Sequence, residues 1–336
     1  MTAHALDLPV DDTAGTLLKR LLGAREFGVV VATAVVVTAC AVLADGFMTT
    51  ANLLTVAQQI AVLGIIAVGM TFVLIAGEID LSVGSLYGFL AVTLASLVTE
   101  IGVPVGGAVP LTIGVGVLIG LVNGLVTTGL GIPSFIVTLA AMGVLRGFAL
   151  LIADDVPVDG SRDPLFHALF AGYPATNLNA STLWMGGVVV IASVVLAKTE
   201  FGYDVYATGG NSSAAGNAGI GTARVKITCF CVSGALCGLA ATVINAQFGN
   251  APPSTGVGYE LYAIAAVVIG GAALSGGTGS ILGALLGAVL TGVISNALVL
   301  FGIDDNWQQV ATGLLILVAV LVNTVIARRS RRGVHS

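Results

Sequence analysis

Long apolar runs separated by short polar segments dominate the hydrophobic pattern of this chain. A bilayer-spanning helix needs about 20 predominantly apolar residues, because each residue rises about 1.5 Å across a hydrocarbon core about 30 Å thick. Ten runs approach that length: 27–43, 53–76, 82–98, 105–126, 135–152, 183–197, 227–246, 261–274, 281–300 and 310–326. Backbone groups in lipid must bond within the protein, and the runs are too long for barrel strands. The pattern therefore predicts an all-α, polytopic transmembrane helical bundle.

Composition excludes a soluble globular protein. Of the 336 residues, 57% are hydrophobic and only 9% are charged, whereas a soluble domain has about 25% charged residues. That deficit leaves too little polar surface to cover a water-soluble molecule. The 46 glycines fit a membrane bundle, because small residues let transmembrane helices approach closely. The predicted environment is membrane lipid, and nothing indicates a nucleic-acid partner.

The distribution of basic residues sets the predicted orientation. Cytoplasmic loops of membrane proteins carry an excess of lysine and arginine. With the N-terminus inside, ten basic residues fall in the cytoplasm: Lys19, Arg20, Arg25, Lys198, Arg224, Lys226, Arg328, Arg329, Arg331 and Arg332. An odd number of spans would separate two basic termini, so the distribution of charge favours ten spans with both termini in the cytoplasm. The predicted parts are 1–26, which includes a short amphipathic helix, the permease domain 27–326 and a basic tail 327–336.

Two connecting segments are longer than the rest. The outer segment, 153–181, contains aspartates and prolines, and is either a solvated connector or a surface that meets a component outside the membrane. The inner segment, 198–226, is rich in glycine, asparagine and alanine. It is either a flexible connector or a surface on which a cytoplasmic partner docks.

Two echoes in the sequence suggest an internal repeat. Residues 81–85 (LSVGS) are echoed by 274–280 (LSGGTGS), and residues 123–126 (NGLV) by 296–299 (NALV). The predicted topology places Asn123 near the inner face and Asn296 near the outer face. Duplicated halves of opposite orientation are common in transporters. Low-complexity glycine-rich sequence is the alternative explanation.

Two acids and a hydroxyl interrupt the apolar pattern between the second and third runs. Burying a carboxylate in a membrane is costly, so Glu78 and Asp80 should meet water, a partner or a polar path. Because they are two positions apart, they would point to different faces of a helix, which argues against a paired-carboxylate catalytic site. Two interpretations stay open. The segment is a broken-helix element beside a translocation path, or a helix cap in which Asp80 or Ser82 bonds free amides.

Four other polar side chains, Asn123, Arg146, Glu260 and Asn296, lie in or beside apolar runs. Each either lines a cavity or bonds a neighbouring helix. With the acid-bearing segment they make up the predicted set of transport-pathway residues: Glu78, Asp80, Ser82, Asn123, Arg146, Glu260 and Asn296.

Signatures of catalysis, metal binding and nucleotide binding are missing from the sequence. No nucleophile elbow, zinc signature or Rossmann glycine pattern occurs in a fitting context. A P-loop requires a lysine directly after glycine, and none of Lys19, Lys198 and Lys226 follows a glycine. The sequence predicts no catalytic residue, no metal site and no cofactor in this chain. If ATP drives transport, then ATP and Mg²⁺ bind a separate polypeptide.

The segment 77–85 (GEIDLSVGS) resembles the hallmark of the ribose/xylose-type sugar permeases of bacterial ABC importers. The resemblance runs from about 52 to 323 and includes further signatures: 133–139 (PSFIVTL) with Arg146 and Gly147, 258–261 (GYEL), 263–271 (AIAAVVIGG) and 276–280 (GGTGS). Within 199–220 the chain resembles that family's cytoplasmic coupling loop. This implies a set of residues for coupling to the ATPase: Gly202, Gly209, Gly210, Asn211, Ala214, Ala215 and Gly219.

This resemblance implies a multi-pass permease subunit in the bacterial inner membrane, without enzymatic activity of its own. Its implied partners are a cytoplasmic ABC ATPase, an extracytoplasmic sugar-binding protein and a second permease chain, either identical or paired. Glu78 and the segment 133–135 look closest to xylose-type members. The sequence leaves open both the sugar and the choice between homodimer and heterodimer.

Two other classes of function are alternatives to an ABC permease. An ion-coupled secondary transporter would need intramembrane acids that take up an ion, and Glu78 with Asp80 are the only close pair. A membrane-anchoring subunit without transport has no positive feature in the sequence. Uptake by the chain alone would distinguish the secondary transporter from the ABC permease.

Overall fold

The computed structural model describes residues 27–173 and 178–303, together with Trp307, Val310, Gly313, Leu314 and Leu317. The predicted segment 1–26, the tail 327–336 and nearly all of the run 310–326 lie outside the described residues. In the described part, helices account for every element except two short strands. The elements are α2 (Phe27–Leu43), α3 (Thr50–Ile75), α4 (Val83–Thr99), α5 (Val105–Leu130), α6 (Ser134–Ala153), β1 (Val158–Asp159), α7 (Pro164–Phe170), α8 (Ala180–Lys198), α9 (Glu200–Gly210), α10 (Ser212–Asn217), α11 (Thr222–Phe248), β2 (Asn250–Ala251), α12 (Tyr259–Ile269) and α13 (Ile281–Leu300).

The predicted helical bundle is confirmed. Each of the nine predicted apolar runs that falls within the described residues contains a helix. Among the described helices, α3, α5, α6, α8, α11 and α13 are long and apolar enough to cross a membrane, whereas α2, α4 and α12 are shorter apolar helices. Ten spans and two cytoplasmic termini therefore stay predictions.

The two largest differences from the predicted ranges are five residues each. Helix α12 stops at Ile269, before the end of the predicted run 261–274, because Gly270 caps it and Gly271 adopts a φ of +94°. Glycine takes this left-handed conformation without the steric cost of a Cβ atom. Helix α11 already begins at Thr222, so Lys226 lies in its first turns rather than in a loop.

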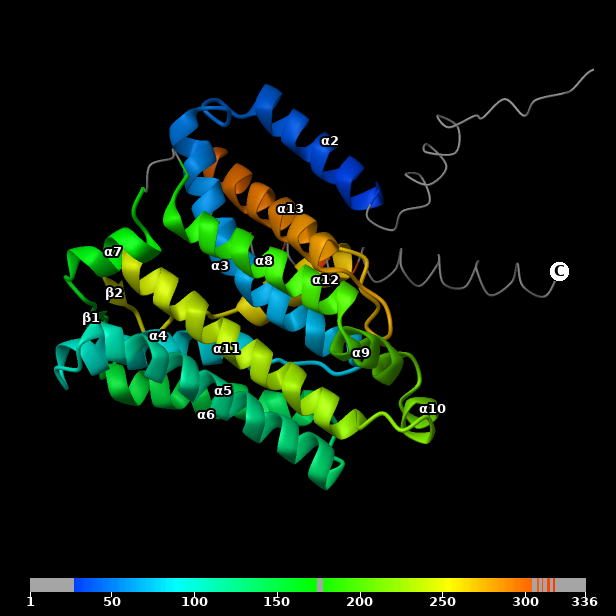
Figure 1. Cartoon of the computed structure of the whole chain (residues 1–336). Helices are drawn as coiled ribbons and strands as arrows, with labels where there is room; N and C mark the ends of the chain where they lie inside the picture. Colours follow the sequence, from blue (N-terminus) through cyan, green and yellow to red (C-terminus); the bar gives the residue numbers. More distant parts are fainter. Residues whose placement is uncertain are drawn as a thin grey trace, which may run out of the picture.

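Helix α3 runs through the centre of the bundle (Figure 1). Helices α2, α8 and α13 lie on one side of it, and α4, α5 and α6 lie on the other. In the most apolar stretch of α3, 89% of the residues are buried, whereas in that of α6 only 17% are buried. An apolar surface all round fits a central helix, and the exposed apolar surface of α6 suits contact with lipid.

Glycines bring α5 and α11 into backbone contact. A Cβ atom at Gly116 would collide with the carbonyl of Gly234, and a Cβ atom at Gly234 would collide with the carbonyl of Gly116. Close approach of this kind is how membrane helices gain van der Waals contact without a hydrophobic drive between them. The packing fixes α11, which carries several of the polar groups described below.

The two ends of the bundle differ in structure (Figure 1). Helices α9 and α10 form one end, and α7 with the two strands forms the other. The strands pair antiparallel, with Val158 opposite Ala251 and Asp159 opposite Asn250. The pairing ties the segment after α6 to the segment after α11.

Candidate translocation site

Two short helices, α4 and α12, begin beside each other inside the bundle. A Cβ atom at Gly84, in the first turn of α4, would lie 2.5 Å from the carbonyl oxygen of Gly256 and 3.1 Å from the amide nitrogen of Glu260. At its other end α12 leads to Gly270, which packs against Gly283 in the first turn of α13. Helix α12 has 11 residues, so it spans about 16 Å. The two helix starts therefore lie about half a hydrocarbon core away from the α9 end.

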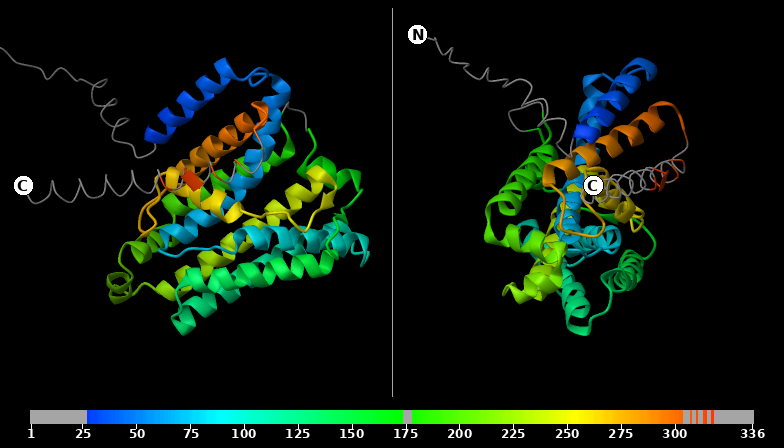
Figure 2. Two further views of the ribbon diagram at one scale, coloured as in Figure 1. Left: turned by 180° about the vertical axis from the view of Figure 1, so that it is seen from behind. Right: turned by 90° about the vertical axis from the view of Figure 1, so that its right-hand side faces the viewer.

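Non-helical chain segments lead to these starts from opposite ends (Figure 2). Residues 76–82, here called the inner crossing segment after the predicted topology, connect α3 to α4, and residues 252–258, the outer crossing segment, form consecutive turns that connect β2 to α12. Irregular backbone at membrane depth occurs where it is buried in protein or lines a cavity. Broken helices whose N-termini meet near the midplane are typical of transporter binding sites, and their positive dipole ends favour acids.

Asp80 forms a hydrogen-bonded turn directly before α4, whose N-cap residue is Ser82. Its carboxylate Oδ1 accepts hydrogen bonds from the amide of Ser82 at 3.0 Å and from the hydroxyl of Ser82 at 2.5 Å. Its Oδ2 accepts one from the hydroxyl of Ser233 on α11 at 3.3 Å. The side-chain amide of Asn123 on α5 donates to the Ser82 hydroxyl at 3.1 Å. With Asp80 only 1% exposed, this polar network joins three parts of the bundle. Asp80 satisfies the amide of the N-cap residue Ser82, and Ser82 itself makes no side-chain cap hydrogen bond.

Helix α6 holds the same segment from another side. The hydroxyl of Ser134 accepts from the amide of Ile79 at 3.1 Å, and the hydroxyl of Thr138 accepts from the amide of Leu81 at 3.0 Å. Both hydroxyls lie one turn apart on α6. They satisfy backbone amides that a broken helix would otherwise leave unpaired in an apolar interior.

Glu78 forms an ion pair with Lys226 of α11. The ammonium nitrogen lies 2.6 Å from the carboxylate oxygen, and the side chains are 12% exposed for Glu78 and 21% for Lys226. Both line a cavity of about 340 Å³ with groups from α5 and the start of α6, among them Thr127 and Pro133. This ion pair, which is largely shielded from water, thus connects the inner crossing segment to a polar cavity.

Arg146 of α6 binds the outer crossing segment. Its Nη1 donates to the carbonyl of Pro253 at 2.7 Å and to the carbonyl of Thr255 at 2.9 Å. Glu260, in the first turn of α12, lies close enough for its opposite charge to attract Arg146, without forming a direct ion pair. Gly88 of α4 leaves room for the Thr255 carbonyl, because a Cβ atom there would collide with it.

Five of the seven predicted pathway residues lie around this meeting point, whereas Glu78 lies nearer the α9 end with Lys226 and Asn296 lies elsewhere. Asn296 lies near the end of α13 and exchanges two side-chain hydrogen bonds with Asn52 of α3, at 3.0 and 2.9 Å. This reciprocal pair joins two helices at the end opposite α9. The geometry is that of an interhelical contact, one of the two alternatives for this residue.

The predicted coupling residues divide into two groups by exposure. Gly210, Asn211, Ala214 and Gly219 are exposed, and Asn211 caps α10 by accepting from the amide of Ala214 at 3.0 Å. Gly202 and Ala215 are buried and Gly209 is partly buried. The first group is free to meet a partner, and the second packs against the protein itself.

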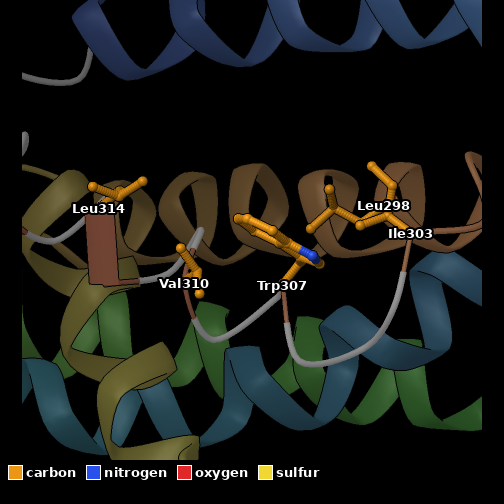
Figure 3. A pocket seen from close by; sticks show the side chains of 5 residues that line it. All are labelled: Leu298, Ile303, Trp307, Val310 and Leu314. Carbon is orange, nitrogen blue, oxygen red and sulfur yellow. The ribbon is translucent and has the colours of Figure 1, made fainter.

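A second cavity, of about 350 Å³, lies beside the end of α13 (Figure 3). It is lined by Leu298, Ile303, Trp307, Val310 and Leu314. Among these described residues, the indole of Trp307 is the one side chain that can form a hydrogen bond, whereas a ligand rich in hydroxyls needs several such partners.

Within the described residues, no cluster of histidine, cysteine and acidic side chains has the geometry to hold a metal ion. The polar groups of the site are instead used by one another, by helix ends and by the two crossing segments.

The sequence of this chain is also clearly related to those of known membrane proteins. A family described as branched-chain amino acid transport system / permease component matches residues 52–320. The chain belongs to this permease family. Relatives include the ribose import permease protein of Haemophilus influenzae, 37% identical over 84% of this chain and 88% of the relative. The ribose import permease protein of Bacillus subtilis is 36% identical over 86% and 89%. The L-arabinose transport system permease protein of Escherichia coli is 37% identical over 88% and 89%.

These relatives confirm the predicted resemblance to ribose-type ABC permeases. The protein is a multi-pass protein of the bacterial inner membrane. No solved structure matches it.

Four polar residues of the site were not among the predicted pathway residues. Lys226 was assigned to the cytoplasm by its charge, and Ser134, Thr138 and Ser233 are small hydroxyl residues in apolar runs. The spacing of Ser134 and Thr138, four residues apart, would have placed them on one face of a helix. The partners of Lys226 and Ser233 could not be read from any local pattern.

Breaking the Glu78–Lys226 ion pair should destabilise the inner crossing segment. We expect Glu78→Gln or Lys226→Gln to lower the free energy of unfolding by about 1.5–3 kcal/mol, the usual contribution of a hydrogen bond to a charged group. The double exchange Glu78→Lys with Lys226→Glu should recover part of that loss. Thermal unfolding of the purified protein in detergent measures both. Equal losses in the single variants with no recovery in the exchange would mean that the two charges act independently.

Proposed function

We propose that this chain is the transmembrane permease subunit of an ATP-binding cassette importer for a monosaccharide. The single observation that carries the proposal is the relationship to ribose and arabinose permeases over most of the chain. The sugar reaches this subunit from an extracytoplasmic binding protein and leaves towards the cytoplasm. A separate cytoplasmic subunit binds ATP and Mg²⁺ and hydrolyses ATP. A second permease chain, identical or homologous, completes the pore.

The pathway passes the meeting point of α4 and α12. Support comes from the polar groups gathered there, namely Asp80, Ser82, Asn123, Arg146 and Glu260. Glu78 lies nearer the α9 end, where it pairs with Lys226. Alternating access then needs only relative movement of the two crossing segments, because each leads from one end of the bundle to this point.

Ten spans with both termini in the cytoplasm agree with where the structure places the charges. Lys198, Arg224 and Lys226 belong to the end of α8 and the start of α11, beside α9 and α10, whereas Arg162 belongs to the opposite end. Positive charge concentrated at the α9 end makes that end the cytoplasmic one.

An inverted repeat also fits the order of elements. A long helix, a non-helical crossing segment, a short helix and a long helix occur in α3–α5 and again in α11–α13. In this alignment Asn123 of α5 corresponds to Asn296 of α13. The other echo, between 81–85 and 274–280, pairs the starts of α4 and α13 and does not fit this order.

Uptake by reconstituted vesicles tests the proposal. Vesicles holding the permease with its ATPase should take up radiolabelled ribose when binding protein is outside and ATP is inside, and not when either is omitted. Xylose and L-arabinose are the alternative sugars. ATP-independent uptake by the permease alone, driven by a proton or sodium gradient, would contradict the proposal and favour a secondary transporter.

A further inference from the structure

Helix α9 is joined to the bundle by backbone contacts at a cluster of four glycines, Gly77, Gly209, Gly276 and Gly277, here called the glycine junction. The amide of Gly277 donates to the carbonyl of Ile75, the last residue of α3, at 2.8 Å. A Cβ atom at Gly209 would collide with that same carbonyl and would lie 2.7 Å from the Gly277 nitrogen. Three chain segments therefore touch here without side chains between them.

Two conformational features keep this contact tight. Gly276 and Gly277 have φ angles of +83° and +74°, which other residues adopt only with strain. A Cβ atom at Gly276 would also lie 2.7 Å from the Cα atom of Gly77. The three backbones can neither separate to admit side chains nor turn without losing the hydrogen bond.

Side chains on α9 strengthen the attachment on either side of the junction. The hydroxyl of Tyr206 donates to the carbonyl of Gly279 at 2.8 Å. The ring of Phe201 stacks on the ring of Phe72 in α3, with centroids 6.1 Å apart. Helix α9 is thus held to the end of α3 and to the segment 270–280 along most of its length.

The junction lies directly before two helix starts. From Ile75 the chain continues through the inner crossing segment to α4, and from Gly279 it continues to α13. Resting on the proposed function, we propose that the glycine junction transmits displacement of α9 by the ATPase to α4 and α13 as one rigid body. Gly209 is then a positioning residue for coupling, and not part of the surface that binds the ATPase.

The neighbouring glycine separates the two roles. Gly210 is exposed, and a Cβ atom there would have no atom within 4 Å. Substitution at Gly210 therefore changes the surface that the ATPase would contact, whereas substitution at Gly209 changes the backbone contact through which α9 would move the bundle. A contact spread over many residues would not give this contrast between adjacent positions.

The test compares Gly209→Ala and Gly210→Trp in the complete importer purified from cells. With Gly209→Ala, the ATPase should co-purify as in wild type and basal ATP hydrolysis should persist, while ribose uptake falls at least about tenfold, within the usual range of coupling effects. Gly210→Trp should lose ATPase co-purification. Gly187→Ala, a helical glycine of α8 with nothing within 4 Å of its added Cβ, is the control and should match wild type in every measurement.

Tyr206→Phe covers the case in which Gly209→Ala fails to insert. It removes only the hydroxyl that bonds Gly279, and uptake should fall by a few fold with ATPase association unchanged. Uptake within about twofold of wild type in either variant, or joint loss of ATPase binding and uptake in Gly209→Ala, would overturn the inference. Failure of the wild-type complex to take up any sugar would instead count against the proposed function.

Discussion

Replacing Arg146 with methionine should be among the most damaging single changes in this protein. The guanidinium donates to two backbone carbonyls of the outer crossing segment, those of Pro253 and Thr255, and faces Glu260. Methionine replaces the aliphatic part of the side chain but leaves both carbonyls and the carboxylate without the guanidinium. Hydrogen bonds from a charged donor contribute about 1.5–3 kcal/mol each, so the loss of two is expected to cost about 3–6 kcal/mol.

Transport should fall further than stability alone explains. The segment that Arg146 holds leads directly into α12 at the proposed pathway, so its displacement alters the site itself. We expect uptake to drop at least about tenfold, since small misplacements at a working site cost large factors in rate. Thermal unfolding in detergent and uptake in cells are the two measurements.

The matched control is Arg162→Met. Arg162 is 92% exposed at the outer end, and its closest approach to Asp159 is 4.0 Å. Exposed pairs of this kind contribute at most about 1 kcal/mol, so this variant should behave as wild type. Arg146→Lys retains the charge and should be intermediate. Wild-type stability and uptake in Arg146→Met would show that the contact between Arg146 and the outer crossing segment is not needed for transport.

The second large effect is expected at Asp80, where two substitutions separate folding from transport. Asp80→Ala removes the acceptor for three hydrogen bonds and should destabilise the protein by about 2–4 kcal/mol, because the donors stay buried without a partner. Asp80→Asn keeps an oxygen for the Ser82 amide and hydroxyl. The Ser233 hydroxyl can turn to accept from the new amide, so we expect a loss below about 1 kcal/mol.

Uptake decides whether the negative charge of Asp80 matters. Helix N-termini favour a nearby anion, and two of them meet close to this carboxylate. We therefore expect Asp80→Asn to insert normally and to lose at least about tenfold in uptake, equivalent to about 1.4 kcal/mol. Normal uptake would leave Asp80 as a helix cap alone.

A cap outside the pathway provides the comparison. Asp163 accepts from the amides of Leu165 and Phe166 at 2.8 and 3.4 Å and begins α7. It is exposed at the outer end of the bundle. Asp163→Asn repeats the chemical change of Asp80→Asn at an ordinary helix cap and should leave uptake unchanged.

The sequence by itself determined the class of this protein and most of its helices. Hydropathy is a local property, and about 20 apolar residues in a row have few alternatives to a membrane helix. The segment 77–85 identified the family by its residues alone. The acid-bearing break was also visible, because carboxylates stand out in apolar sequence.

Only the tertiary structure decided how these parts work together. Lys226 meets Glu78, and Arg146 meets Pro253, across 148 and 107 positions of sequence, and no local pattern specifies such partners. Hydropathy also does not reveal that α12 ends at Ile269 or that α4 and α12 start side by side. The same holds for Gly209 and Gly210, which are identical in sequence terms and differ only in what surrounds them. Contacts between distant segments depend on how helices pack in three dimensions, and a one-dimensional pattern carries no information on that packing.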